Sequence, residues 1–253
     1  MSLEGLDAGI LAPAFVAGLI VLSTHIPLGY EVLKRGIIFI DIAVAQIAGL
    51  GVIIAYTLGW DEHGLAAQLA AVISALLGAW LLGRLETRYG RHQEALIGTS
   101  FILAATGGIL LLANNPHGGE HLKELLVGQI LWVEWRQLLY AAIISLAVLI
   151  VWIRYRARIG SLGFYLLFAI AITVSVQLVG VYLVFASLIV PALASTGYSV
   201  RSGLGLSVII GITGYATGLI LSALLDLPSG AVIVWTIVIA ALLLKLAIPK
   251  KMG

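Results

Sequence analysis

The chain has 253 residues, of which 61% are apolar and only 10% are charged, and its formal net charge is +2. A soluble domain of this size carries far more charge on its surface, so an ordinary soluble protein is excluded. The absence of cysteine excludes disulfides and thiolate metal sites. We therefore expect a single transmembrane domain over residues 1–253, in an all-α polytopic protein embedded in a lipid bilayer with no nucleic-acid partner.

Apolar runs long enough to be membrane helices follow one another along the whole chain. A bilayer core about 30 Å thick needs roughly 20 apolar residues in a helix. Such runs lie near residues 9–32, 37–59, 65–83, 95–113, 137–153, 162–178, 180–197, 203–224 and 229–247. The sixth and seventh runs are short and meet at a weak join, so the sequence predicts about nine transmembrane helices, with eight as the alternative. The amphipathic stretch from Leu122 to Gln137, which holds Trp132 and Trp135, predicts a helix on the membrane surface.

The basic residues predict the orientation of these helices in the membrane. Threading nine spans places 12 of the 14 basic residues on one side: Lys34, Arg35, Arg84, Arg88, Arg91, Arg154, Arg156, Arg158, Arg201, Lys245, Lys250 and Lys251. Basic loops face the cytoplasm in membrane proteins. We therefore expect the N-terminus outside and the C-terminus in the cytoplasm.

Sequence motifs for chemistry on this chain are absent. Neither a nucleotide-binding loop, G-x-x-x-x-G-K-[ST], nor a G-x-S-x-G or H-E-x-x-H motif occurs. We therefore expect a transport subunit, not an enzyme. It would need no cofactor of its own, and any ATP hydrolysis would take place on another chain.

Three stretches of sequence resemble one protein family. They are Leu33–Gly36 with the residues up to Gly51, Leu125–Leu131, and Val174–Val184 running on to Ala192. A weaker match is Asp226–Ala231. In order and spacing these stretches are similar to the permease subunits of bacterial ABC importers for zinc, manganese and iron.

The resemblance implies an assembly in the bacterial inner (cytoplasmic) membrane. Two permease chains would form a homodimer around a central path, above two ATP-binding subunits that carry ATP and Mg. An extracytoplasmic solute-binding protein would deliver the cargo. In the family, the cytoplasmic loop after the fifth span carries a short coupling helix on the ATPase. The matching segment is Arg154–Gly163, several residues shorter than the usual loop, and its coupling candidates are Arg154, Arg156, Arg158 and Gly160.

The second span departs from the family at its metal-binding motif. The family motif G-D-A-x-S-H places an Asp and a His on the metal path. An ungapped alignment from Arg35 to Gly51 puts Ile42 at the Asp position and Gln46 at the His position, while Asp41 falls one residue early. A neutral amide is a poor ligand for zinc or manganese. The metal ligands of the path, if any, are therefore unknown from the sequence.

Polar residues within the spans are the remaining candidates for the path, because ionisable groups are costly in lipid. His25, Asp41 and Gln46 are the candidates for the translocation path. Each has a second interpretation: His25 as a hydrogen-bonded helix residue, Asp41 as the partner of the basic pair Lys34–Arg35, and Gln46 as a bond between helices. Glu31 is expected to form a salt bridge with the same basic pair.

Acidic residues and histidines gather in the loops predicted to lie outside. They are Asp61, Glu62, His63, His117, Glu120 and His121. Such a rim would concentrate divalent cations at an outer entrance. The alternative is a set of ordinary polar loop residues.

The sequence thus predicts the permease of an ATP-driven importer for a divalent transition metal, zinc or manganese, that works by alternating access. One alternative is the same type of permease with a chelated metal or another small solute as cargo. A second alternative is a stand-alone secondary transporter, which would show inverted repeats and more charges along its path.

Overall fold

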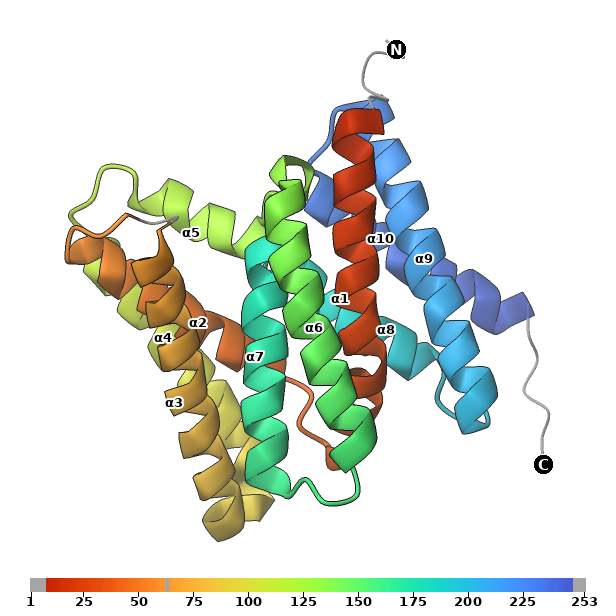
Figure 1. Ribbon diagram of the computed structural model, residues 1–253, viewed down its shortest axis with the longest axis horizontal. Helices are drawn as coiled ribbons and strands as arrows, with labels where there is room; N and C mark the ends of the chain where they lie inside the picture. The colour runs from red at the N-terminus through yellow and green to blue at the C-terminus, as the bar shows by residue number, and fades with distance from the viewer. Residues whose placement is uncertain (1–7, 62–63, 248–253) are drawn as a thin grey trace.

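A computed structural model describes residues 8–61 and 64–247 of the protein (Figure 1). Within these residues the chain forms ten α-helices and short 3-10 segments at Gly90–His92 and Ile130–Trp132, and no strand. The helices are α1 (Ala8–Arg35), α2 (Ile40–Thr57), α3 (Leu65–Tyr89), α4 (Gln93–Leu112), α5 (Gly118–Val127), α6 (Trp135–Tyr155), α7 (Ser161–Val179), α8 (Val181–Ala194), α9 (Val200–Leu225) and α10 (Ser229–Ala247). The predicted all-α fold is confirmed.

Each of the nine predicted spans coincides with a helix. By length and composition, seven helical runs among the described residues can cross a membrane, and one of these, Leu65–Leu112, contains both α3 and α4. The chain turns between α3 and α4, and both pack along α2. Helix α8 has only 14 residues, about 21 Å at 1.5 Å per residue, so it is shorter than a bilayer core. The number of helices that cross the membrane stays a prediction.

The weak join between the sixth and seventh predicted spans is a sharp break between α7 and α8. Gly180 separates the two helices with φ 80°, in a region that favours glycine. Its N–H still donates to the carbonyl of Val176 at 2.8 Å, which closes the last turn of α7. A single helix through both segments is therefore not formed.

The surface helix predicted from Leu122 to Gln137 does not extend over this whole stretch, so the prediction is wrong in its length. Helix α5 ends at Val127 because Gly128 adopts φ 72°, and α6 already begins at Trp135. Helix α5 lies across the end of the molecule at which α1 begins (Figure 1).

Small residues let the last two helices, α9 and α10, approach closely. A Cβ on Gly214 would lie 2.8 Å from the Cα of Ile237, and one on Gly218 would lie 2.7 Å from the Cα of Ile233. Close backbone contact of this kind is the usual means of helix association in membranes. Helix α1 packs against α6, α7, α8 and α9, so it lies at the centre of the bundle.

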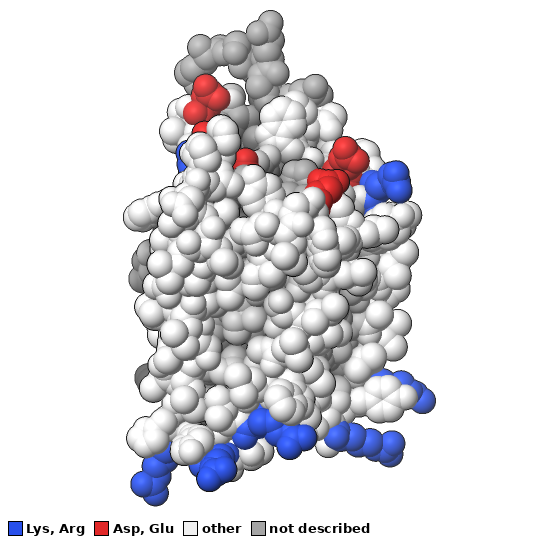
Figure 2. All heavy atoms as spheres, turned by 90° about the vertical axis from the view of Figure 1, so that its left-hand side faces the viewer, with Lys and Arg blue, Asp and Glu red and all other residues white. Residues whose placement is uncertain are grey.

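Charged side chains are separated along the long direction of the helices. Figure 2 shows one face on which Lys and Arg gather at the end where α1 finishes, while Asp and Glu lie towards the opposite end beside a few further Lys and Arg side chains. The surface between them carries almost only uncharged side chains. This separation is what the positive-inside rule requires of a membrane protein. The assignment of the basic end to the cytoplasm stays a prediction.

Candidate translocation groove

One face of α2 lines a cavity of about 680 Å³. Ile42, Gln46, Gly49 and Ile53 follow the i, i+4, i+7, i+11 spacing that places residues on one side of a helix. The rest of the wall comes from α4, α5, α7, α8 and α10. Gln46, which the sequence proposes for the path, thus lines this cavity together with Ile42 one turn before it, and its role in translocation stays a prediction.

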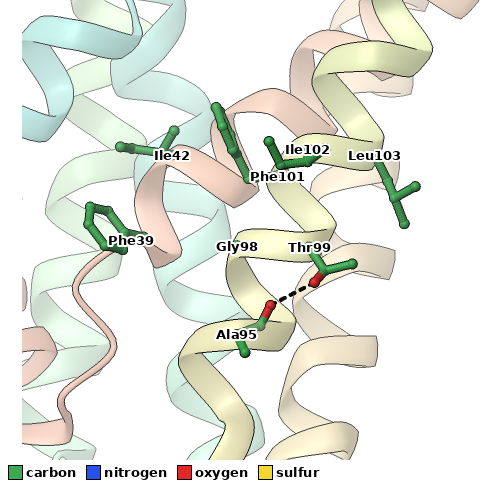
Figure 3. A pocket seen from close by; sticks show the side chains of 8 residues that line it. All are labelled: Phe39, Ile42, Ala95, Gly98, Thr99, Phe101, Ile102 and Leu103. Carbon is green, nitrogen blue, oxygen red and sulfur yellow. Dashed lines mark hydrogen bonds between the residues drawn. The ribbon is translucent and has the colours of Figure 1, made fainter.

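A second cavity of about 620 Å³ continues this space towards the basic end of α2 and α4 (Figure 3). Ile42 and Phe101 line both cavities. At its start lies Phe39, whose ring stacks on Phe185 of α8 with 6.2 Å between the ring centroids. We call the two cavities together the translocation groove.

The wall of the translocation groove is almost free of polar groups. Among the described residues that line it, the polar side chains are Gln46, Thr99, Tyr182 and Trp235, and none of these described lining residues is charged or a histidine. The hydroxyl of Thr99 donates to the carbonyl of Ala95 within α4 at 2.8 Å (Figure 3). No group of three or more His, Cys, Asp or Glu residues that could hold a metal ion occurs in the described part of the chain.

His25 does not line the groove. It is fully buried in α1, where its Nδ1 lies 3.1 Å from the hydroxyl of Thr24 and its Nε2 has no hydrogen-bond partner. Helix α1 continues through Pro27 without a break. A role for His25 on the path stays a prediction.

Asp41 also lies outside the groove wall, although its neighbour Ile42 belongs to it. Only 1% of Asp41 is exposed, and neither carboxylate oxygen has a hydrogen-bond partner. The expected alternative, a salt bridge to Lys34 or Arg35, is not formed, because Arg35 instead binds Glu31 with 2.9 Å between Nε and Oε1. The predicted salt bridge of Glu31 is therefore confirmed.

Helix α5 covers the end of the groove that lies opposite its basic end. Its apolar residues Leu122, Leu125 and Leu126 line the larger cavity. At its C-terminal end, Gly128 contacts the break at Gly180, and a Cβ on Gly230 at the start of α10 would lie 2.5 Å from the carbonyl oxygen of Val127. The ends of α5 and α7 and the starts of α8 and α10 thus meet where α5 is fixed to the bundle. The glycines of this junction occur in the stretches that carry the family resemblance.

The predicted outer rim is described only in part. Nδ1 of His117 lies 3.2 Å from a carboxylate oxygen of Glu120, and both side chains are exposed. Asp61 is also exposed. Glu62 and His63 lie outside the described residues, as does the side chain of His121. The structure therefore shows one pair of the predicted rim, and an outer entrance stays a prediction.

At the basic end, Arg35 joins several helices in a network that the sequence did not predict beyond Glu31. Its Nη1 donates to the hydroxyl of Ser161 at 3.2 Å, and its guanidinium lies 4.3 Å from the ring centroid of Phe164. The hydroxyl of Ser161 in turn donates to Glu86. One arginine thus holds helices α1, α3 and α7 together. The sequence predicted only its pairing with Glu31 and its place in the first resembling stretch.

The predicted coupling residues lie in or beside the turn between α6 and α7. Arg154, Arg156 and Arg158 are all exposed, and Nη2 of Arg156 lies 3.6 Å from Oε2 of Glu31. Gly160 precedes α7, and its carbonyl accepts the N–H of Phe164 at 3.1 Å. The turn residues 156–160 form no helix of their own. Arg156 therefore links this turn to the Arg35 network, and contact with an ATPase stays a prediction.

The helical fold, the charge separation and the groove together define a multi-pass membrane protein of the transporter class. The sequence profile of the ABC 3 transport family matches residues 7–162 and 155–248. The chain belongs to this family.

Known proteins are similar to this chain over most of its length. A "Probable metal transport system membrane protein" of Chlamydia muridarum is 29% identical over 226 residues, which cover 81% of this chain and 77% of that protein. The manganese transport system membrane protein MntC of Halalkalibacterium halodurans is 28% identical, over a match that covers 82% of this chain and 76% of that protein. A solved structure of PsaBC from Streptococcus pneumoniae in complex with Fab has a TM-score of 0.77 at 22% identity, and the match covers 99% of this chain and 98% of that chain. This last similarity shows the shared fold.

Proposed function

We propose that the chain is the permease subunit of an ATP-driven importer for a divalent transition metal, zinc or manganese. The translocation groove is the observation that supports this proposal, because it extends from under α5 to the basic end of α2 and α4. The names of the relatives in Chlamydia and Halalkalibacterium, both membrane proteins of metal transport systems, support the choice of cargo.

A second copy of the chain would complete the groove. Tyr182 and Trp235 line the larger cavity but remain 54% and 70% exposed. In a homodimer these side chains would be buried against the partner, and two half-grooves would enclose one path. Alternating access would then open the path first to one side of the membrane and then to the other.

The remaining partners follow from what this chain lacks and from where its charges lie. The sequence holds no nucleotide-binding loop, so ATP and Mg would bind to a separate ATPase subunit. That subunit would dock at the basic end, against the turn with Arg154, Arg156, Arg158 and Gly160. An extracytoplasmic binding protein would deliver cargo near α5, and the complex would reside in the bacterial inner membrane.

The proposal is tested by expressing the chain with its candidate ATPase and purifying the complex. We expect the two to purify together and the ATP turnover of the complex to rise when metal-loaded binding protein is added. Deletion of the permease should slow growth in medium that contains a metal chelator. A complex without metal-dependent turnover, together with unchanged growth of the deletion strain, would exclude a metal importer. Uptake by this chain alone would point instead to a secondary transporter.

A further inference from the structure

The chemistry of the larger cavity restricts the form in which a metal crosses the membrane. Bare zinc and manganese ions bind to imidazole, thiolate or carboxylate groups. The described residues of the wall offer none of these groups, and their polar side chains are Gln46, Tyr182 and Trp235. The cost of moving an ion into an apolar environment is large and grows with the square of its charge, so a divalent ion is strongly disfavoured there.

Dimerisation would not supply the missing ligands. A second copy would present the same wall, so the enclosed path would hold two Gln46 side chains and still no charged side chain among the described lining residues. The buried Asp41 and His25 lie outside the wall in each copy.

The wall instead has the composition of a site for a small organic molecule. Such sites are mostly apolar and aromatic, hold a few polar groups, and measure roughly 300–1,000 Å³. The cavity measures about 680 Å³, and four aromatic side chains line it: Phe101, Tyr182, Phe185 and Trp235. The amide of Gln46 can both donate and accept hydrogen bonds.

We infer that the metal crosses this permease as an organic chelate of low net charge, bound by Gln46 and by the aromatic side chains of the wall. The inference rests on the proposed function as a metal importer. A chelate brings its own ligands, so the wall needs only to match its shape and its few hydrogen-bonding groups. An apolar, uncharged wall is complementary to such a complex and not to a free divalent ion.

The test uses the complete complex of permease, ATPase and binding protein in proteoliposomes. Zinc-65 is supplied as the aquo ion in a weakly coordinating buffer, with ¹⁴C-citrate, or with ¹⁴C-histidine. We expect ATP-dependent zinc uptake from a chelate at least about tenfold faster than from the aquo ion, with ¹⁴C entering at a fixed ratio to zinc. Faster uptake of the aquo ion, or zinc uptake without ¹⁴C, overturns the inference and leaves the proposed function intact. No uptake of any form counts against both.

Variants of Gln46 show whether the wall itself selects the chelate. Gln46→Leu should lower the rate of chelate uptake about tenfold. Gln46→Asn keeps the amide, so its uptake rate should lie between those of Gln46→Leu and the wild type. Gln68→Leu is the matched control, because Gln68 is exposed on α3 and does not line the cavity. Equal uptake by wild type and Gln46→Leu, with equal protein in the membrane, would contradict a role for this amide.

Discussion

Gly128 and Gly180 touch backbone to backbone, at the point where α5 ends and α7 gives way to α8. A Cβ on Gly180 would lie 2.4 Å from the backbone nitrogen of Gly128, and a Cβ on Gly128 would lie 2.3 Å from the carbonyl carbon of Val179. Both residues have positive φ, at 72° and 80°. Neither position therefore has room for a side chain, and each has a conformation that other residues rarely adopt.

Gly180→Ala should destabilise the folded protein by at least about 2 kcal/mol, because backbone strain and a steric clash act together. We expect a clearly lower melting temperature in detergent or nanodiscs. Gly205→Ala is the control, since Gly205 lies within α9 with open space around its Cβ position. The control should melt at or above the wild-type temperature, because alanine favours helices. If Gly180→Ala and the wild type had equal melting temperatures, the contact between Gly128 and Gly180 would have to be looser than the structure shows.

Much of the fold could be predicted from the sequence because apolar length determines membrane helices so directly. The predicted runs match helices, and the weak join near Gln177 corresponds to the break at Gly180. The surface helix from Leu122 to Gln137 was predicted too long because its apolar pattern continues past Gly128, whereas the positive φ of this residue depends on its contact with Gly180.

The groove was harder to predict than the helices. A membrane helix that is apolar all round has no polar face to show which side meets its neighbours. In α2, Gln46 lines the cavity while Asp41 lies on another side. The alignment puts Gln46 at a family ligand position and Asp41 one residue before the other, but both stayed candidates because each is a polar residue within the span. Phe39, Tyr182 and Trp235 gave no signal, because aromatic residues are common in membrane spans for reasons of packing and anchoring.

Arg35→Ala should destabilise the protein by about 2–4 kcal/mol. The change leaves the carboxylate of Glu31, whose side chain is only 10% exposed, without its 2.9 Å partner. Arg154→Ala is the matched control, because Arg154 is exposed at the same end, and it should change stability by less than about 0.5 kcal/mol. Thermal unfolding of both variants measures the difference. Similar melting of the two would mean that the Arg35 network contributes little to stability.

The predicted orientation can be tested by single cysteine substitutions, since the chain has no cysteine of its own. Glu120→Cys in α5 and Arg158→Cys in the α6–α7 turn both replace exposed residues at opposite ends. In intact spheroplasts, a membrane-impermeant maleimide should label Glu120→Cys, and it should label Arg158→Cys only after permeabilisation. Labelling in the reverse order would overturn the orientation.

Adding ligands to the groove should change which form of zinc is accepted. Ile42 and Gln46 are four residues apart on the same face of α2 and both line the larger cavity. The double variant Ile42→Asp/Gln46→His supplies a carboxylate and an imidazole, so we expect uptake of aquo zinc by the full complex to rise about tenfold. Ala66→Asp/Ala70→His on α3, outside the groove, serves as the control for added charge. If aquo zinc uptake by the control rose as much as uptake by the groove variant, ligands in the groove would not explain which form of zinc is accepted.

ATP-dependent metal uptake by the reconstituted complex is the most direct test of a permease in an ATP-driven importer. The complex of this chain with its ATPase and binding protein is placed in proteoliposomes, and uptake of zinc-65 and manganese-54, each as aquo ion and as chelate, is followed with ATP or with a non-hydrolysable analogue. We expect uptake of at least one of the two metals that requires ATP, the ATPase and the binding protein together. Metal uptake that is as fast without ATP as with it, or uptake by this chain alone, would contradict the proposal that the chain is a permease of an ATP-driven importer.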